Sequence, residues 1–366
     1  MHIDLDTFLA AVYTTVDEVY TSFCAPHKPP RPGAAPSMTD SEVITLAVLS
    51  QWELRNSIDS MRKYAKSHWH RYFNIILTQS AFNKRVLDLA GAMCHMVPII
   101  ADNLQKWLSL HPTHSIIDGV AVPIIKCFRG NNRKVLAESA DFGIGGSDKK
   151  MYFGFKIVSI TNSDGLITGF AVGSASTSEL WLAECIFRFR KNPNAALPTP
   201  ENMEKVLGKS KSKAQRVGIK RPINISGIGK SSDNPIIGDL LFKAKKWSEH
   251  WIKTYGVKVL TRDIYKNLKE TRKKFKKWIS KLRQPIETTF NWIESELGLH
   301  YCNARSFKGF LARIGAKLIG YNIAVGMNHA RGAGRFEITE LNPMKLASSG
   351  KYEKVEAGGA EKRRRS

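Results

Sequence analysis

The order of strand-like and helix-like segments after residue 110 constrains this chain more than any other feature. Three β-rich runs come first, SIIDGVAVPIIKCF, MYFGFKIVSI and LITGFAVGS, and NSDG at 162–165 is typical of a hairpin turn between the last two. The pattern then predicts a helix over 178–191, a strand at NPIIGD, a helix that stops at Gly256, a strand at VKVLTR and further helices. Three strands joined as hairpins and followed by α/β units predict a mixed sheet with flanking helices.

Residues 1–110 are predicted to form an all-helical domain. Apolar residues recur at helical spacing over 5–19, and Thr39 or Asp40, with Glu42 in the first turn, can cap a helix that begins near residue 40. The polar faces carry many basic residues, which favours a DNA-binding domain, with a plain helical bundle as the alternative. The basic residues concerned are Arg62, Lys63, Lys66, His70, Arg71, Lys84 and Arg85.

The charge balance indicates a polyanionic partner. The chain has 56 Lys+Arg against 32 Asp+Glu, a net charge of +24, and the excess extends through segments with a folded pattern. DNA or RNA is the expected partner, and a solubility charge or attraction to a membrane surface is the alternative. Residues 191–234 are expected to form a basic insertion and 331–366 a disordered basic tail.

No stretch of about 18 uninterrupted apolar residues occurs, so no membrane span is expected. The chain does not begin with a basic stretch followed by an apolar run, as a signal peptide would. The five cysteines are scattered and lack CxxC spacing, which indicates free thiols rather than zinc ligands. We therefore expect a cytoplasmic, nucleoid-associated protein.

Three acidic residues stand in separate settings that predict a metal site. Asp118 and Asp239 each follow a β-branched run, so each is expected at the end of a buried strand, and Glu287 opens an amphipathic helix after Pro285. Taken singly, each acid also fits a turn, a helix N-cap or a favourable first-turn position. Together they predict a site for two Mg²⁺ or Mn²⁺ ions, because hard ions prefer oxygen ligands and such ions catalyse phosphodiester chemistry.

The motifs around these acids resemble those of the DDE transposases of bacterial insertion sequences. IIDGVAVP is similar to the family's first-aspartate strand and PIIGDLLF to its second. Arg283 and Glu287 in RQPIETTFNWIE match the Arg-x-x-x-Glu signature. MYFGFKIVSITNSDGLITGFAV matches the two strands between the aspartates, including a Tyr-x-Gly-x-Lys pattern at Tyr152, Gly154 and Lys156. The sequence departs from related signatures at Leu240, Leu241, Ser280 and Glu294.

The resemblance implies an RNase H-like catalytic domain over 111–330, in which the first and fourth strands lie side by side. It implies that Asp118, Asp239 and Glu287 hold two metal ions, with Asp118 bridging them, for cleavage and transfer of DNA strands. The implied partners are double-stranded DNA, as element ends and target, and a second copy of the chain on DNA. DNA contacts are expected from Arg283, Lys156, Lys273, Lys274, Lys277 and Lys281. The alternatives are a non-catalytic DNA-binding protein derived from a transposase and an RNase H-like nuclease without strand transfer.

Overall fold

The structure is a computed structural model, and the residues that it describes leave several gaps. They are 3–28, 33, 35–52, 58–126, 136, 138–145, 150–193, 198–199, 202–203, 223–225, 235–261, 269–300, 302–334, 337 and 341. The predicted basic insertion 191–234 and the predicted tail 331–366 therefore lie for the most part outside the described residues. Of the cysteines, Cys24, Cys94, Cys185 and Cys302 are free thiols, as predicted.

The N-terminal region is helical, as the sequence predicts. Thr39 caps the second helix: its hydroxyl accepts a hydrogen bond from the Glu42 N–H, and the Glu42 carboxylate accepts one from the Thr39 N–H, which completes a capping box. The segment predicted as one helix over 78–97 is two helices that meet at Leu89. The helices are α1 (Leu5–Val19), α2 (Asp40–Leu49), α3 (Ile58–His68), α4 (Gln79–Asp88) and α5 (Ala90–Trp107), with short helices η1 (Tyr20–Cys24) and η2 (Ala25–His27) after α1.

A mixed sheet follows, with strand order β5-β4-β3-β1-β6-β7 and with β2 paired to β3. β1 runs antiparallel to β3 and parallel to β6, and β6 runs parallel to β7. The predicted α/β class, the mixed sheet and its flanking helices are confirmed. β2 and β5 were not predicted. The strands are β1 (Ser115–Lys126), β2 (Asp141–Gly145), β3 (Lys150–Asn162), β4 (Ile167–Ser174), β5 (Ile223–Ile225), β6 (Ile236–Gly238) and β7 (Val259–Leu260).

The predicted hairpin turn joins β3 to β4. Gly165 has φ +92°, a conformation that favours glycine, and its N–H donates to the Asn162 carbonyl at 3.0 Å. The Asn162 side-chain oxygen accepts from the N–H groups of Asp164 and Leu166 at 3.1 and 2.9 Å. The polar residues NSDG thus satisfy the turn's own backbone groups, which is why this stretch marks a turn in the sequence.

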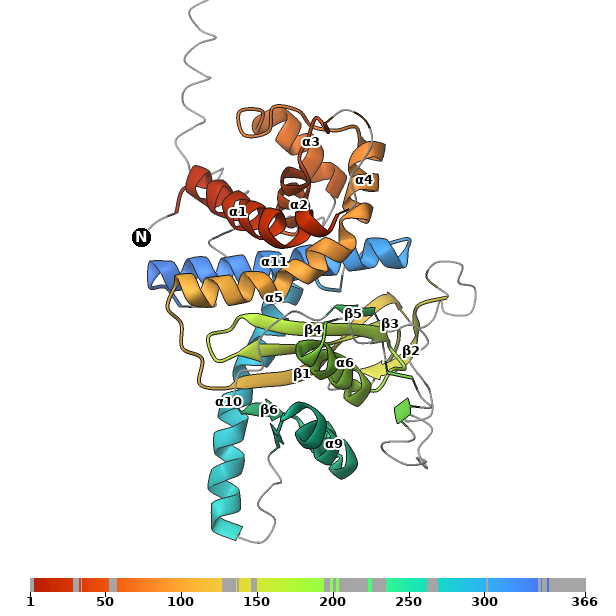
Figure 1. The fold of residues 1–366 in the computed structure, drawn as a ribbon, viewed down its shortest axis with the longest axis vertical. Helices are drawn as coiled ribbons and strands as arrows, with labels where there is room; N and C mark the ends of the chain where they lie inside the picture. The colour runs from red at the N-terminus through yellow and green to blue at the C-terminus, as the bar shows by residue number, and fades with distance from the viewer. Residues whose placement is uncertain are drawn as a thin grey trace, which may run out of the picture.

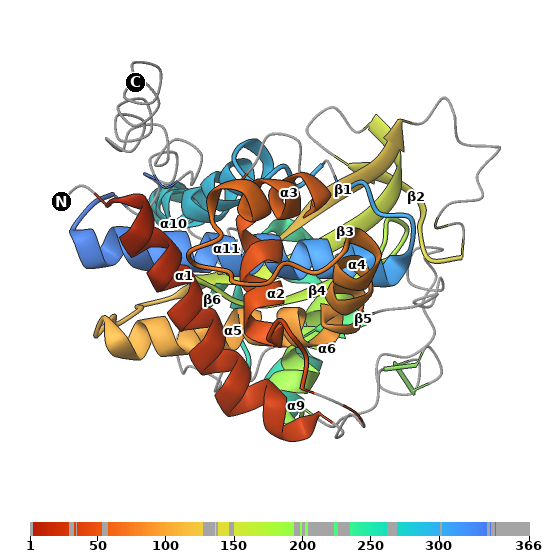
Figure 2. The ribbon, with the colours of Figure 1, turned by 90° about the horizontal axis from the view of Figure 1, so that it is seen from above.

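Helices cover both faces of the sheet. In Figure 1, α5 and α11 form a layer between the sheet and the group α1–α4, and Figure 2 shows α1 and α2 lying over that layer. α6 and α9 pack on the opposite face, where Trp181, Phe187 and Trp251 share a hydrophobic cluster with strand residues. The helices that follow β4 are α6 (Glu179–Lys191), η4 (Leu240–Lys243), α9 (Lys245–Tyr255), α10 (Lys269–Ser295) and α11 (Phe307–Arg331).

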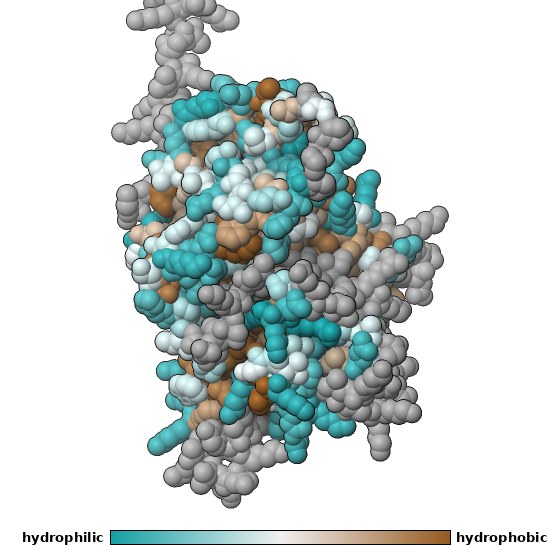
Figure 3. Space-filling model, viewed as in Figure 1, coloured by the Kyte–Doolittle hydropathy of each residue, from teal (hydrophilic) through white to brown (hydrophobic). Residues whose placement is uncertain are grey.

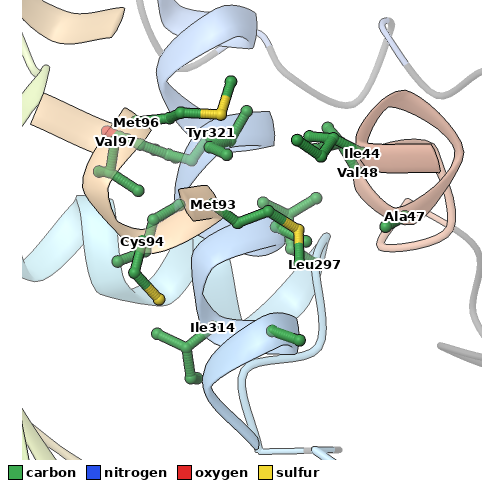
Figure 4. Packing of buried hydrophobic residues seen from close by; sticks show 14 of the residues in the cluster. Ile44, Ala47, Val48, Met93, Cys94, Met96, Val97, Leu297, Ile314 and Tyr321 are labelled. Atoms are coloured by element: carbon green, nitrogen blue, oxygen red, sulfur yellow. The ribbon is translucent and has the colours of Figure 1, made fainter. Parts of the chain in front are cut away.

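One hydrophobic cluster joins the N-terminal helices, α11 and the sheet. It includes buried residues of α1, α5, α11 and β4, such as Phe8, Ile100, Ile319 and Phe170. Figure 4 shows side chains of α2, α5 and α11 meeting in this cluster. α5 and α11 approach closely because Gly315 has no side chain: a Cβ there would lie 3.0 Å from the Cys94 amide nitrogen.

A long helix, α10, corrects the sequence prediction of two helices separated at Pro285. The structure has one helix over Lys269–Ser295 with Pro285 inside it. Buried residues recur at helical spacing on both sides of the proline, at Ile279, Ile286, Phe290 and Ile293. The continuous apolar stripe therefore outweighs the backbone hydrogen bond that the proline removes.

Asn322 ties α11 to both neighbouring layers. Its side-chain oxygen accepts from the Ile167 N–H of β4 at 2.8 Å, and its amide donates to the carbonyls of Val97 in α5 and Ile167, each at 3.0 Å. The residue is fully buried. All of these groups would otherwise be polar atoms without water inside the core.

We predict that Asn322→Ala lowers the free energy of unfolding by about 2–4 kcal/mol, because it strands buried backbone groups. Urea unfolding followed by circular dichroism measures the loss. Asn291→Ala, at an exposed position of α10, is the matched control and should change the stability by less than about 0.5 kcal/mol. Equal stability of the two variants would contradict the role given to Asn322.

Candidate active site

Asp118 and Asp239 lie at neighbouring positions because β1 and β6 are paired in parallel. The register pairs Ile117 with Gly238, one residue before each aspartate. The Asp118 carboxylate accepts a hydrogen bond from the Gly119 N–H at 2.9 Å. The Asp239 carboxylate accepts one from the Leu240 N–H at 2.6 Å and caps η4. The sequence prediction that these strands lie side by side, with both aspartates at their ends, is thus confirmed.

The two aspartates share one guanidinium, that of Arg283. Its Nη2 lies 2.8 Å from Asp118 Oδ2 and its Nη1 lies 3.3 Å from Asp239 Oδ1. The side chains of Arg283 and Asp118 are 17% and 16% exposed, so this pair is largely withdrawn from water. Arg283 comes from α10, which contacts both β1 and β6 (Figure 1). The helix thus delivers a cation to the exact edge where the aspartates meet.

A third carboxylate, that of Glu179, lies beside this pair, and sequence reasoning missed it. Glu179 is the first residue of α6, and its carboxyl group lies over Gly119: a Cβ on Gly119 would be 2.8 Å from Glu179 Cδ. Lys156 Nζ lies 3.5 Å from Glu179 Oε1. An acid directly after Ser178 reads in the sequence as an ordinary first-turn residue, so no signal there distinguishes it.

The three carboxylates influence one another's protonation. Burial raises the pKa of Asp118, Arg283 and the Gly119 N–H lower it, and Asp239 raises it. Burial also raises the pKa of Glu179, Lys156 lowers it, and Asp118 and Asp239 raise it. Each of these two acids therefore senses Asp239, which makes the group one electrostatic unit of three acids and two bases.

Glu287 lies apart from these acids. Its side chain is exposed on α10, one turn after Arg283. Within the residues that the structure describes, no group of three or more His, Cys, Asp or Glu side chains is arranged to hold a metal ion. The predicted metal role of Glu287 therefore stays a prediction. Glu287 lines an open hollow of about 470 Å³ together with Lys277, Ser280, Lys281, Arg283 and Gln284.

The basic face of α10 adjoins this hollow. Lys273, Lys274, Lys277 and Lys281 are exposed. Trp278 is 50% exposed, whereas Trp292 packs against the core. Of the residues predicted to contact DNA, these four lysines thus point to solvent, while Arg283 and Lys156 contact carboxylates of the site.

In the N-terminal helices, several of the predicted DNA-binding cations have acidic partners. Arg62 and Lys63 both pair with Asp59, and Arg85 pairs with the buried Asp40. Arg71 pairs with Asp6 at 3.0 Å. The exposed cationic positions of this region include Lys66, His70 and Lys84. A DNA-binding role for residues 1–110 remains a prediction, and its electrostatic basis is narrower than the sequence suggests.

When the chain is compared with models of protein families, with curated proteins and with solved structures, none of the three comparisons gives a match. None of the helices in the described residues combines the length and apolar character needed to cross a bilayer. On the face shown in Figure 3, hydrophilic side chains predominate over the described surface.

Gly154 of the Tyr-x-Gly-x-Lys pattern has a steric role next to the site. A Cβ at this position would lie 2.2 Å from the Val122 carbonyl oxygen, where β1 has an irregularity between Pro123 and Ile125. Two residues earlier, Tyr152 is buried, and burial together with the charge of Glu179 raises the pKa of its hydroxyl. The pattern thus combines a close backbone approach with two side chains near Glu179.

We predict that Gly154→Ala lowers the free energy of unfolding by about 2–3 kcal/mol, because the added methyl meets backbone that cannot rotate away. Gly91→Ala is the matched control: no atom lies within 4 Å of its Cβ position, and alanine favours the helix α5. Urea unfolding should show Gly91→Ala unchanged or slightly more stable. A Gly154→Ala protein of wild-type stability would rule out the close approach.

Proposed function

We propose that this chain is a metal-dependent DNA strand transferase of the DDE type, an insertion-sequence transposase. The observation that carries the proposal is the placement of Asp118 and Asp239 at adjoining strand ends, where they share one cation at 2.8 and 3.3 Å. Two carboxylates held together against their mutual repulsion need positive charge, and a basic chain has little other reason to bury them side by side.

The sheet supports an RNase H-like assignment for the catalytic region. The strands β4-β3-β1-β6-β7 follow the order expected from the resemblance, with β3 antiparallel to its neighbours and β6 and β7 parallel to β1. In this order the first and fourth strands of the series carry the two aspartates. The motif-based resemblance and the strand order are separate observations that favour the same class.

The donor set fits a hard divalent ion. Asp118 and Asp239 offer oxygen ligands, and Mg²⁺ is commonly held by one or two carboxylates together with water and phosphate. These residues would hold Mg²⁺ or Mn²⁺, with Glu287 as the proposed third ligand and two ions as the proposed number. When bound, the metal would make an attacking hydroxyl more acidic and stabilise charge on the leaving oxygen.

The remaining residues of the site would bind and orient DNA. The exposed lysines of α10 lie next to Arg283 along one helix, so they can bind successive phosphates of a strand that approaches the aspartates. Trp278, which is 50% exposed among these lysines, can stack on an unpaired base. The proposed reaction is cleavage at the ends of a DNA element and joining of the freed 3′ hydroxyl to target DNA, by a homodimer assembled on that DNA.

The principal test removes a carboxylate without changing its size. Asp118→Asn and Asp239→Asn should still retard DNA in a gel, but their nicking of supercoiled plasmid in Mg²⁺ should fall by at least about 10³-fold. Glu18→Gln, at an exposed position of α1, is the control and should nick as the wild type does. Undiminished nicking by Asp118→Asn would remove this residue from the site.

Products of the wild-type reaction separate the alternatives. Incorporation of a labelled oligonucleotide with a free 3′ hydroxyl into plasmid indicates strand transfer. Nicking without incorporation indicates a nuclease. Retardation of DNA without any Mg²⁺-dependent nicking indicates a non-catalytic DNA-binding protein, and either of these last two results contradicts the proposal.

We also predict a change in salt dependence for the double variant Lys277→Ala/Lys281→Ala. Each lost phosphate contact releases fewer counterions, so the slope of log K against log salt concentration should fall by about 2. Fluorescence anisotropy of labelled DNA at several salt concentrations measures the slope. Lys106→Ala, at the end of α5, is the control and should leave the slope as it is.

A further inference from the structure

We infer that Arg283 is an internal counter-cation that exchanges with the divalent metal at Asp118 and Asp239. In the metal-free protein its guanidinium holds the two aspartates together, and metal binds in those molecules in which Arg283 has withdrawn. The inference deepens the proposed function and rests on it for the presence of a metal at these carboxylates.

The guanidinium uses the same oxygen atoms that a shared ion would use. Asp118 Oδ2 faces Arg283, while Asp118 Oδ1 accepts from the Gly119 N–H. Asp239 Oδ1 faces Arg283 and also accepts from the Leu240 N–H. An ion bound by both carboxylates from this side would meet a positive charge at contact distance, in a place where water screens little. Guanidinium and metal therefore compete for one position.

Arg283 is held only near its tip. Its two Nη atoms contact the aspartates, whereas its buried Nε has no hydrogen-bond partner among the described residues. The Arg283 side chain also lines the open hollow on α10, so space for a second orientation adjoins the first. Glu287, on the same hollow, offers a carboxylate to the withdrawn guanidinium one helical turn away.

Lys156 does not take part in this exchange. Its Nζ lies 3.5 Å from Glu179 Oε1, and both residues lie on the side of the sheet where α6 begins. The charge on Glu179 is therefore balanced separately. Removal of Arg283 alone leaves Asp118 and Asp239 with two negative charges and no direct partner, which is the condition in which a divalent ion binds best.

The test is Mn²⁺ binding to the full chain without DNA, followed by the electron paramagnetic resonance signal of free Mn²⁺. If Arg283 bridges the aspartates in about nine-tenths or more of the molecules, its removal tightens the apparent Kd by about tenfold or more. Arg283→Gln should show this gain, and Arg283→Gln/Asp118→Asn should lose it. Lys281→Gln is the matched control, because it removes one charge from the same helix, and its Kd should stay within about twofold of wild type.

Arg283→Lys covers the case in which the glutamine variant does not fold. A single ammonium cannot contact both carboxylates as the fork of a guanidinium does, so its Kd should fall between those of wild type and Arg283→Gln. Melting temperature gives a second readout: saturating Mn²⁺ should raise it more for either Arg283 variant than for wild type.

The outcomes separate this inference from the proposed function. Equal Mn²⁺ affinity in wild type and Arg283 variants, with Mg²⁺-dependent nicking by wild type, overturns the inference and leaves the function in place. Tighter binding by the variants without any nicking by wild type supports the exchange and overturns the function. Absence of Mn²⁺ binding in every variant overturns both.

Discussion

The parallel pairing of β1 with β6 is the constraint on which the candidate site depends. β6 has only three residues, and its place in the sheet relies on Gly238, where a Cβ would lie 2.8 Å from Val259 Cγ1 of β7. A larger residue there would push β6 away from its neighbours and change the position of the aspartate that follows. The separation of Asp118 and Asp239 in space is thus set by backbone packing, and their charges are accommodated afterwards by Arg283.

The distribution of charge explains how a strongly basic chain forms an acidic centre. Asp118, Asp239 and Glu179 converge from β1, β6 and α6, and Arg283 and Lys156 are the cations placed against them. Many other cations of the folded region are paired within it, as Arg85 is with Asp40. The exposed lysines of α10 are different, because they stand on a helix that extends beyond the sheet (Figure 1). The positive field available to a polyanion therefore lies close to the acidic centre.

Much of the fold could be predicted from the sequence because local signals agreed with it. The turn at Asn162 and Gly165, the capping box at Thr39 and the helix stop at Gly256 all depend on neighbouring residues. The convergence of Asp118 and Asp239 followed from strand order. Glu179 could not be found, since only the tertiary fold brings the start of α6 over Gly119. The unbroken course of α10 through Pro285 was missed for a related reason: tertiary burial of Ile286 and Phe290 outweighs a local helix breaker.

The place of α11 in the structure has a consequence for biosynthesis. This helix is the last long element of the chain, yet it lies at the centre of the layer between the sheet and the N-terminal helices. Until residue 331 has left the ribosome, the apolar faces of α5 and β4 have no covering partner. At translation rates of about 5–20 residues per second, those faces stay open for many seconds. Completion of the fold is therefore a post-translational event, and a nascent or prematurely terminated chain would be a substrate for chaperones and proteases.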